Sequence, residues 1–395
     1  MRDSVRRRRQ TAKEIKVKIV ERASCKRGFQ KKGRLAIAVA LTLACLIFYF
    51  RLSDPPFDLE NLTDEERAEL KLAEPALIAN LTANSPYQLG RFCDSGGDCF
   101  VVEQRYWMMR GGDLRAQRLI MYELNDRMAL TMANLKTPEI ITAHHLVHER
   151  WAVDPTILSF SYNLMQIAAG FMLEGLSFGP SLNDSAPVQQ PAQQLQRVLQ
   201  IGMGGGTATG YLRMLPIQLH LDIVELEPAV YEAAKRWFDF PVAEPNINVH
   251  IMDGVVFLKE AAESGLTFDS LILDASSNSP TASIVCPHPV FMADDVMDAM
   301  SKVLGAHGVL SVNVFMPEEQ ERLQEEVIRK FHAHFRSCSA LKILANGQKF
   351  LVCSNRDGFT WAAHRTRMLV NLEQFDEVMG TSLAPYLDRL NPVVQ

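Results

Sequence analysis

The segment between residues 197 and 228 restricts what this chain can fold into more than any other part of its sequence. An apolar run from Val198 to Ile201 leads into a glycine-rich turn, and a helical pattern begins at Thr207. The glycines of the turn are Gly202, Gly204, Gly205 and Gly206. A turn without side chains at a helix N-terminus lets a ligand approach backbone amides, and an acid about 20 positions further on is placed to hold ribose hydroxyls. Glu225 stands at that spacing, so the segment predicts a nucleoside-binding site.

Alternating patterns continue from Arg197 towards the C-terminus, where short apolar runs typical of strands are each followed by a helical pattern. Such alternation predicts a parallel sheet with helices on both faces. The pattern changes where the runs ALKIL and KFLVC flank Asn346-Gly347, which is a strong two-strand hairpin signal. A parallel sheet that finishes in an antiparallel hairpin is the arrangement of class I S-adenosylmethionine-dependent methyltransferases. The expected fold is therefore an α/β, Rossmann-like sheet with a C-terminal antiparallel hairpin.

Acidic residues stand where successive predicted strands end, and ligands of such sheets bind at the carboxyl edge of the strands. Glu225 is placed to hold a ribose, with Glu227 as a second candidate, and Asp253 to accept from an adenine amino group. Asp274 faces the reaction centre and is the predicted catalytic residue. Acids that follow strands also cap helices, which is the alternative for each of them taken singly. The predicted cofactor-binding set is Gly202, Gly204, Gly206, Glu225, Asp253, Gly254 and Asp274.

Four motifs, VLQIGMGGG, VELEP, HIMDG and LILDASSNSP, resemble the signature of the spermidine synthase-like group of class I methyltransferase folds. Within that group, the block DASSNSPTASIVCPHPVF (274–291) and the helix end AAKRWFDF (233–240) resemble the C-terminal domain of the elongation factor one-alpha lysine and N-terminal methyltransferases. The resemblance covers about 160–355. It implies S-adenosylmethionine as the cofactor and methyl transfer as the activity.

The loop after Asp274 departs from both branches of that group. Aminopropyltransferases hold the attacking amine with a second acid in this loop, whereas 275–278 read ASSN here, and Leu164 stands at an upstream acidic position. A cationic polyamine would meet too little negative charge, and its attacking nitrogen would lack a base. Ser276 and Ser279 stand where the elongation-factor enzymes have acids. The methyl acceptor is therefore left open as a protein or small-molecule nucleophile.

Two classes of function are consistent with these residues. The first is a methyltransferase in which Asp274 orients or deprotonates the acceptor, with His288 either an assistant base or a structural residue. Tyr162 and Trp237 either pack near the pocket or belong to the core. The second is a catalytically degenerate binding or scaffold protein, and aminopropyl transfer is a less favoured third reading. No partners stand at ligand spacing around His144-His145, so no metal is predicted.

The N-terminal region is strongly basic and then strongly apolar. Residues 1–34 carry an excess charge of +11, and because the whole chain carries −5 the remainder carries −16, which argues against nucleic acid as a ligand. The unbroken apolar run at 35–50 predicts an uncleaved signal anchor, a transmembrane helix over 35–52. Basic residues ahead of an anchor stay cytosolic, so the expected localisation is single-pass type II, with a lumenal domain in the endoplasmic reticulum or Golgi. A cytosol-facing anchor is the alternative.

Sequons and cysteines bear on that orientation. Sequons predict a glycoprotein, and they begin at Asn61, Asn80 and Asn183. Cys93 and Cys99 bracket a short loop that closes as a disulfide in an oxidising lumen or holds two free thiols in a cytosolic protein. Three further cysteines of the C-terminal region form an odd number that pairs poorly: Cys286, Cys338 and Cys353.

The expected domains follow from these patterns. They are a basic arm (1–34), a transmembrane anchor (35–52), a linker with an amphipathic helix (53–90), a small β-module (91–150), a methyltransferase-like domain (151–360) and a C-terminal tail (361–395). A homodimer is left open.

Overall fold

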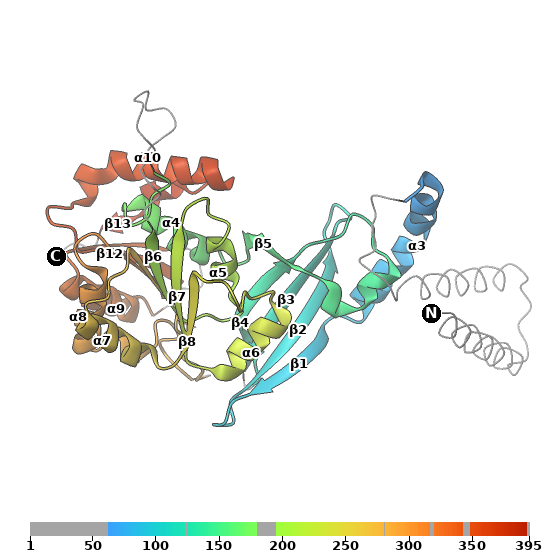
Figure 1. The fold of residues 1–395 in the computed structure, drawn as a ribbon, viewed down its shortest axis with the longest axis horizontal. Helices are drawn as coiled ribbons and strands as arrows, with labels where there is room; N and C mark the ends of the chain where they lie inside the picture. The colour runs from blue at the N-terminus through green and yellow to red at the C-terminus, as the bar shows by residue number, and fades with distance from the viewer. Residues whose placement is uncertain are drawn as a thin grey trace, which may run out of the picture. The chain divides into compact units, whose positions relative to one another are not determined.

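Two β-sheets organise the chain (Figure 1). The structure is a computed structural model that describes residues 62–123, 125–179, 195–279, 281–316, 320–342 and 348–392. Residues 69–395 form one compact unit that contains both sheets.

The larger sheet has eight strands in the order β13-β11-β12-β10-β9-β6-β7-β8. The strands from β8 to β10 pair in parallel, whereas β12 is antiparallel to both β10 and β11. This order confirms the predicted Rossmann-like, class I methyltransferase arrangement with its antiparallel hairpin. The strands are β6 (Gln196–Ile201), β7 (Leu219–Glu225), β8 (Ile247–Ile251), β9 (Ser270–Leu273), β10 (Val309–Val314), β11 (Ser337–Lys342), β12 (Lys349–Ser354) and β13 (Asn391–Pro392).

Helices cover both faces of this sheet, because its central strands are apolar on both sides. One hydrophobic cluster joins the sheet to α4 (Ser161–Met172), α5 (Thr207–Leu212) and α10 (Trp361–Met379). The cluster on the opposite face joins it to α7 (Gly254–Ser264), α8 (Asp294–Leu304) and α9 (Glu321–His334). Every residue of β9 and β10 is buried, which is why these strands read as continuous apolar runs in the sequence.

The smaller sheet is an antiparallel meander in the order β1-β2-β3-β4-β5. Its buried face packs against α6 (Pro228–Trp237), the helix that follows β7, through a cluster that includes Phe100, Ile120 and Trp151. We refer to this sheet as the β-module, and its strands are β1 (Tyr87–Cys93), β2 (Cys99–Met108), β3 (Leu114–Tyr122), β4 (Asn125–Leu135) and β5 (Val153–Leu158). The helix α3 (Asp64–Ala83) precedes it, and Leu81 joins the same cluster.

The C-terminal segment 361–395, predicted as a tail, carries regular structure. Here α10 packs against α4, with Phe375 fully buried beside Phe171. The short helix η5 (Ala384–Arg389) follows, and β13 then adds an antiparallel strand to β11. The tail prediction is corrected accordingly, since its apolar residues complete the core on one face of the sheet.

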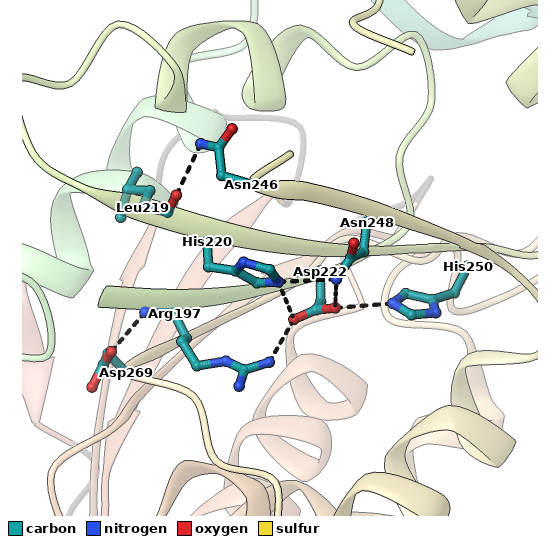
Figure 2. Close-up of polar contacts among 8 residues, drawn as sticks. All are labelled: Arg197, Leu219, His220, Asp222, Asn246, Asn248, His250 and Asp269. Atoms are coloured by element: carbon teal, nitrogen blue, oxygen red, sulfur yellow. Dashed lines mark hydrogen bonds and ion pairs between the residues drawn. The ribbon is translucent and has the colours of Figure 1, made fainter. Parts of the chain in front are cut away.

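The outer parallel strands are tied together by a carboxylate, Asp222 on β7 (Figure 2). Arg197 Nη2 on β6 donates to Asp222 Oδ2 at 3.0 Å, and on β8 Asn248 Nδ2 donates to Oδ1 at 3.1 Å. His250 Nε2 lies 3.0 Å from Oδ1 and His220 Nε2 lies 3.6 Å from Oδ2. Burial alone would raise the pKa of Asp222, but these partners outweigh it and lower that pKa to about 2. The carboxylate therefore links three neighbouring strands.

Two disulfides cross neighbouring strands. Cys93 and Cys99 are register partners of β1 and β2 and form the disulfide that the sequence left open. Cys338 and Cys353 are register partners of β11 and β12 and form the second. Cys286 remains a buried free thiol. The expectation that these last three cysteines pair poorly is therefore wrong for two of them.

The predicted membrane localisation is corrected. Within the ranges that the structure describes, no helix is long and apolar enough to cross a bilayer. The anchor predicted at 35–52 lies outside the described residues, as do the basic arm and the sequons at Asn61 and Asn183. Asn80 lies on an exposed position of α3.

Candidate active site

The glycine-rich turn joins β6 to α5 with three residues in the left-handed region. Its φ angles are +87° at Gly202, +53° at Gly204 and +76° at Gly206, values that residues with a Cβ rarely adopt. A Cβ at Gly202 would lie 2.4 Å from the carbonyl oxygen of Asp274. Glycine at this position therefore allows the ends of β6 and β9 to meet, and the turn lies at the predicted carboxyl edge of the sheet.

Glu225 ends β7, and backbone amides hold its carboxylate. Oε2 accepts from the Met203 amide at 2.9 Å, and Oε1 accepts from the Glu227 amide at 3.0 Å. Burial raises the pKa of Glu225, and the hydrogen bonds from these amides oppose that rise. The amides of Gly204 and Leu226 also act on this carboxylate, so backbone donors hold Glu225 beside the glycine turn.

Asp253 and Gly254 occupy the turn after β8. Asp253 is the N-cap of α7, and its Oδ1 accepts from the Val255 amide at 2.7 Å. This bond matches the capping alternative, but it uses one oxygen of an exposed carboxylate and leaves the other for a ligand. Gly254 is buried, and a Cβ there would lie 2.8 Å from Ile201 Cγ2 and 3.1 Å from Phe291 Cζ. Close packing of α7 on β6 explains the glycine.

Asp274 follows β9 and collects four donors, all of them neutral. Oδ2 accepts from Tyr162 Oη and from Asn163 Nδ2, each at 3.1 Å. Oδ1 accepts from Asn313 Nδ2 at 2.9 Å, and the thiol of Cys286 lies 3.7 Å away. Burial raises the pKa of Asp274, and the donors partly offset that rise. The carboxylate is thus fixed in direction by side chains from α4, β10 and the following loop.

Several residues of this network were missed by sequence reasoning. Asn163 sits beside Tyr162, which the sequence left undecided between pocket and core, and Tyr162 lies in the site through its bond to Asp274. Asn313 is a polar residue inside the apolar run of β10, a signal that could have been used. Gln348 donates to Asn313 Oδ1 at 3.1 Å. It follows the predicted Asn346-Gly347 turn, which lies outside the described residues.

Two other expectations are settled by packing. Trp237 is 4% exposed and belongs to the core between α6 and the β-module. His288 is the N-cap of the short helix η4 (Pro289–Met292), and its Nδ1 accepts from the Val290 amide at 3.3 Å. That bond favours the structural role for His288.

An acidic cluster borders the site beside Glu225. Asp94 and Asp98, in the loop between β1 and β2, lie with Glu227 so that carboxylate oxygens of all three are within 4.8 Å of one another. Burial, a hydrogen bond with Asp94 and the neighbouring negative charges raise the pKa of Glu227 to about 7. Tyr122 Oη donates to Asp98 at 2.6 Å. Glu227, the second ribose candidate, thus contacts the β-module.

The strand order and the carboxyl-edge site together define a class I methyltransferase-type domain. Comparison with known families narrows this class, because residues 186–362 match the spermine/spermidine synthase domain. The match covers most of the α/β part of the chain and agrees with the resemblance that its motifs indicate. The glycine turn and the acids that follow β7, β8 and β9 all fall within the matched residues.

Individual relatives belong to both branches. The eEF1A lysine and N-terminal methyltransferase of Xenopus laevis is 28% identical over 183 residues, covering 46% of this chain and 25% of that protein. The polyamine aminopropyltransferase of Vibrio vulnificus is 33% identical over 120 residues, covering 30% and 38%. The crystal structure of human methyltransferase-like protein 13 in complex with SAH aligns with a TM-score of 0.47 at 20% identity, covering 56% and 94%. The chain spans about a quarter of the length of the eEF1A methyltransferases that it matches.

Proposed function

We propose that this protein binds S-adenosylmethionine and transfers its methyl group to a nucleophile on a protein or small molecule. The observation that carries the proposal is the meeting of the glycine turn, Glu225 and Asp274 at one edge of the sheet. The Met203 amide of the turn donates to Glu225, and Gly202 packs directly on the backbone of Asp274. The similarity to the eEF1A methyltransferases supports methyl transfer as the reaction.

The donor and acceptor set fits a nucleoside. Glu225 ends β7 with a carboxylate at the spacing from the glycine turn at which nucleoside sites hold the ribose hydroxyls. The exposed carboxylate of Asp253, one strand further along the edge, has an oxygen left to accept from an exocyclic amine. Both acids stand at the carboxyl ends of neighbouring parallel strands, so they lie at the same edge of the sheet as the turn.

Asp274 and Tyr162 would orient the methyl acceptor and take up its proton. When bound, the cofactor would supply an electrophilic methyl group on its sulfonium. Tyr162 donates its only proton to Asp274, so its oxygen is left to accept from the N–H or O–H of an attacking group. As that group is methylated, its proton would pass to Tyr162 while the Tyr162 proton passes to Asp274. The raised pKa of Asp274 suits it to receive that proton.

Calorimetric titration of the full-length protein with S-adenosylmethionine tests the binding step. We expect Glu225→Gln to weaken binding, because its amide NH2 cannot accept from both the turn and a ribose. Glu232→Gln is the matched control, since Glu232 is an exposed residue of α6 that pairs with Lys235. Absence of measurable heat with the wild-type protein would overturn the proposal.

A second reading, a binding or scaffold protein without turnover, is favoured by one observation. The four acceptor positions of Asp274 are all in use, and 275–279 add no second acid. Incubation with methyl-tritiated S-adenosylmethionine and purified elongation factor one-alpha or a cell extract separates the readings. Binding without label transfer supports the scaffold. Tighter binding of decarboxylated S-adenosylmethionine instead indicates aminopropyl transfer, for which the loop lacks charge.

A further inference from the structure

The β-module contacts the glycine turn directly, and Thr131 of β4 makes the hydrogen bond. Thr131 is 4% exposed, and its Oγ1 accepts from the Gly205 amide at 2.7 Å. These two residues are 74 positions apart in the chain. The bond therefore exists only because the β-module packs against the carboxyl edge of the larger sheet.

This bond completes the hydrogen bonding of the turn. The Met203 amide donates to Glu225, and the Gly206 amide donates to the Met203 carbonyl. The Gly205 amide lies between them and finds its acceptor in Thr131, outside the α/β domain. A buried amide without an acceptor is costly, so removal of the hydroxyl would favour a different path of the turn.

Thr131 also explains two of the glycines. A Cβ at Gly204 would lie 2.2 Å from Thr131 Oγ1, and a Cβ at Gly205 would lie 2.7 Å from Thr131 Cγ2. Side chains at these positions would push the β-module away from the turn. The absence of side chains there thus serves contact with the β-module, in addition to any approach by a ligand.

The neighbouring turn is held from the same side. Asp94 and Asp98 of the β1–β2 loop lie against Glu227, two residues beyond Glu225. The β-module therefore touches both turns that flank the predicted ribose position. Because both turns contact the same sheet, the sheet restricts the distance between the turn after β6 and the turn after β7.

We propose that Thr131 is a positioning residue of the cofactor site, and that the β-module is a structural wall of that site. This inference rests on the proposed binding of S-adenosylmethionine. Thr131 acts through Gly205: it holds the turn in the path that keeps Met203 on Glu225, so that Glu225 is oriented before the cofactor arrives. Loss of that preorganisation weakens binding without removing any group that touches the cofactor.

The test compares three variants of the full-length protein by calorimetry with S-adenosylmethionine and by amide hydrogen exchange of residues 202–212. Thr131→Val removes the hydroxyl at nearly constant shape, and it is expected to weaken binding by about 5- to 100-fold and to accelerate exchange in the turn. Thr131→Ser keeps the hydroxyl and is expected to bind within about threefold of wild type, since the acceptor for Gly205 is retained. Thr156→Val is the matched control, because its hydroxyl bonds Asp154 on the exposed part of β5.

The outcomes are separable from failure of the proposed function. If wild type and Thr131→Val bind equally and exchange equally, the positioning role is overturned. If Thr131→Ser weakens binding as much as Thr131→Val does, the hydroxyl is not the cause and the proposal also fails. If wild type binds no S-adenosylmethionine, the proposed function fails. The hydrogen-exchange measurement still tests Thr131 in that case, because unchanged exchange of residues 202–212 in Thr131→Val would overturn its positioning of the turn.

Discussion

Asp274 accepts from four donors, and none of the four carries a charge. A cationic partner would stabilise the ionised form and lower the pKa of the carboxyl group. Neutral donors fix its direction while leaving its negative charge uncompensated. With burial raising its pKa, Asp274 is a stronger base than an exposed aspartate. The arrangement suits a group that must orient another side chain and accept a proton briefly.

Tyr162→Phe tests this arrangement. The change removes the hydroxyl between Asp274 and the acceptor, so we expect the rate of methyl transfer to fall by about 10- to 100-fold. The affinity for S-adenosylmethionine should stay the same, because Tyr162 contacts neither the turn nor Glu225 in the described hydrogen bonds. Single-turnover kinetics and calorimetry measure the two quantities.

The control is Tyr211→Phe, because the buried hydroxyl of Tyr211 has no hydrogen-bond partner. Its removal should leave the rate unchanged. Equal loss in both variants would show that Tyr162 acts through general packing.

The outer strands of the larger sheet depend on one carboxylate. Asp222 on β7 accepts hydrogen bonds from Arg197 on β6 and from Asn248 on β8. Its carboxylate therefore adds side-chain bonds to the backbone pairing of these three strands. Figure 2 shows these side chains converging on Asp222. Such a buried, well-bonded carboxylate makes the stability of the element depend on acid pH.

Asp222→Asn should lower the free energy of unfolding by about 2 kcal/mol at pH 7, the value of a pKa held at about 2 against an ordinary 3.8. Because the folded pKa is depressed, this stabilisation is present above pH 3.8 and is lost as the pH falls through about 2. Urea unfolding at several pH values should show wild type and variant converging in acid. Asp113→Asn, at an exposed turn residue, is the control. A constant difference at all pH values would contradict the prediction.

The contact between the β1–β2 loop and α6 has the opposite dependence on pH. Glu227, the N-cap position of α6, has its pKa raised from 4.5 to about 7 by burial and by the carboxylates of Asp94, Glu225 and Asp98. A protonated Glu227 can share its proton with Asp94. An ionised Glu227 adds a third negative charge to the same small volume.

A group with a raised folded pKa contributes most stability below its unfolded value. For Glu227 this contribution declines as the pH rises from 4.5 through about 7. Wild type should therefore lose melting temperature relative to Glu227→Gln between pH 5 and pH 8. Calorimetric melting at these pH values measures the difference, with Glu260→Gln on the exposed side of α7 as the control. Parallel melting curves for wild type and Glu227→Gln would refute the assignment.

At the scale of the whole molecule, a buried arginine fastens the β-module to the methyltransferase-like domain. Arg118 on β3 donates to Gln104 Oε1, to the carbonyls of His148 and Trp151, and to the carbonyl of Trp237 at the end of α6. Burial lowers its pKa to about 10, so it stays charged at neutral pH. Its planar group lies over the Trp237 ring at 5.7 Å.

Arg118→Met should lower the free energy of unfolding by at least about 3 kcal/mol, because several buried acceptors lose their donors at once. The exposed neighbour Arg115→Met, on the same strand, should change it by less than about 0.5 kcal/mol. Denaturant titrations of both variants give the two values. Similar losses in both would show that the apolar contacts of β3 alone hold the β-module in place.

The sequence predicts those parts of the fold that depend on residues close together in the chain. The Asn346-Gly347 signal predicts the hairpin of β11 and β12, and the run of glycines between an apolar strand and a helix predicts the turn, where Gly202, Gly204 and Gly206 adopt left-handed backbone angles. The segment 361–395 was missed as structured because its helix α10 has apolar positions on no single strong face. It is ordered by packing against α4.

Local residue order was therefore enough for the class of fold, the position of the turn and the acids at the strand ends, because strand periodicity and glycine backbone freedom act over a few residues. The packed structure alone assigns the partners of Asp274, the threonine that holds Gly205 and the arginine that fastens α6. Those contacts join residues that are far apart in the chain. Hydrogen bonding between such residues is decided by which surfaces the whole fold brings together, and no short pattern encodes it.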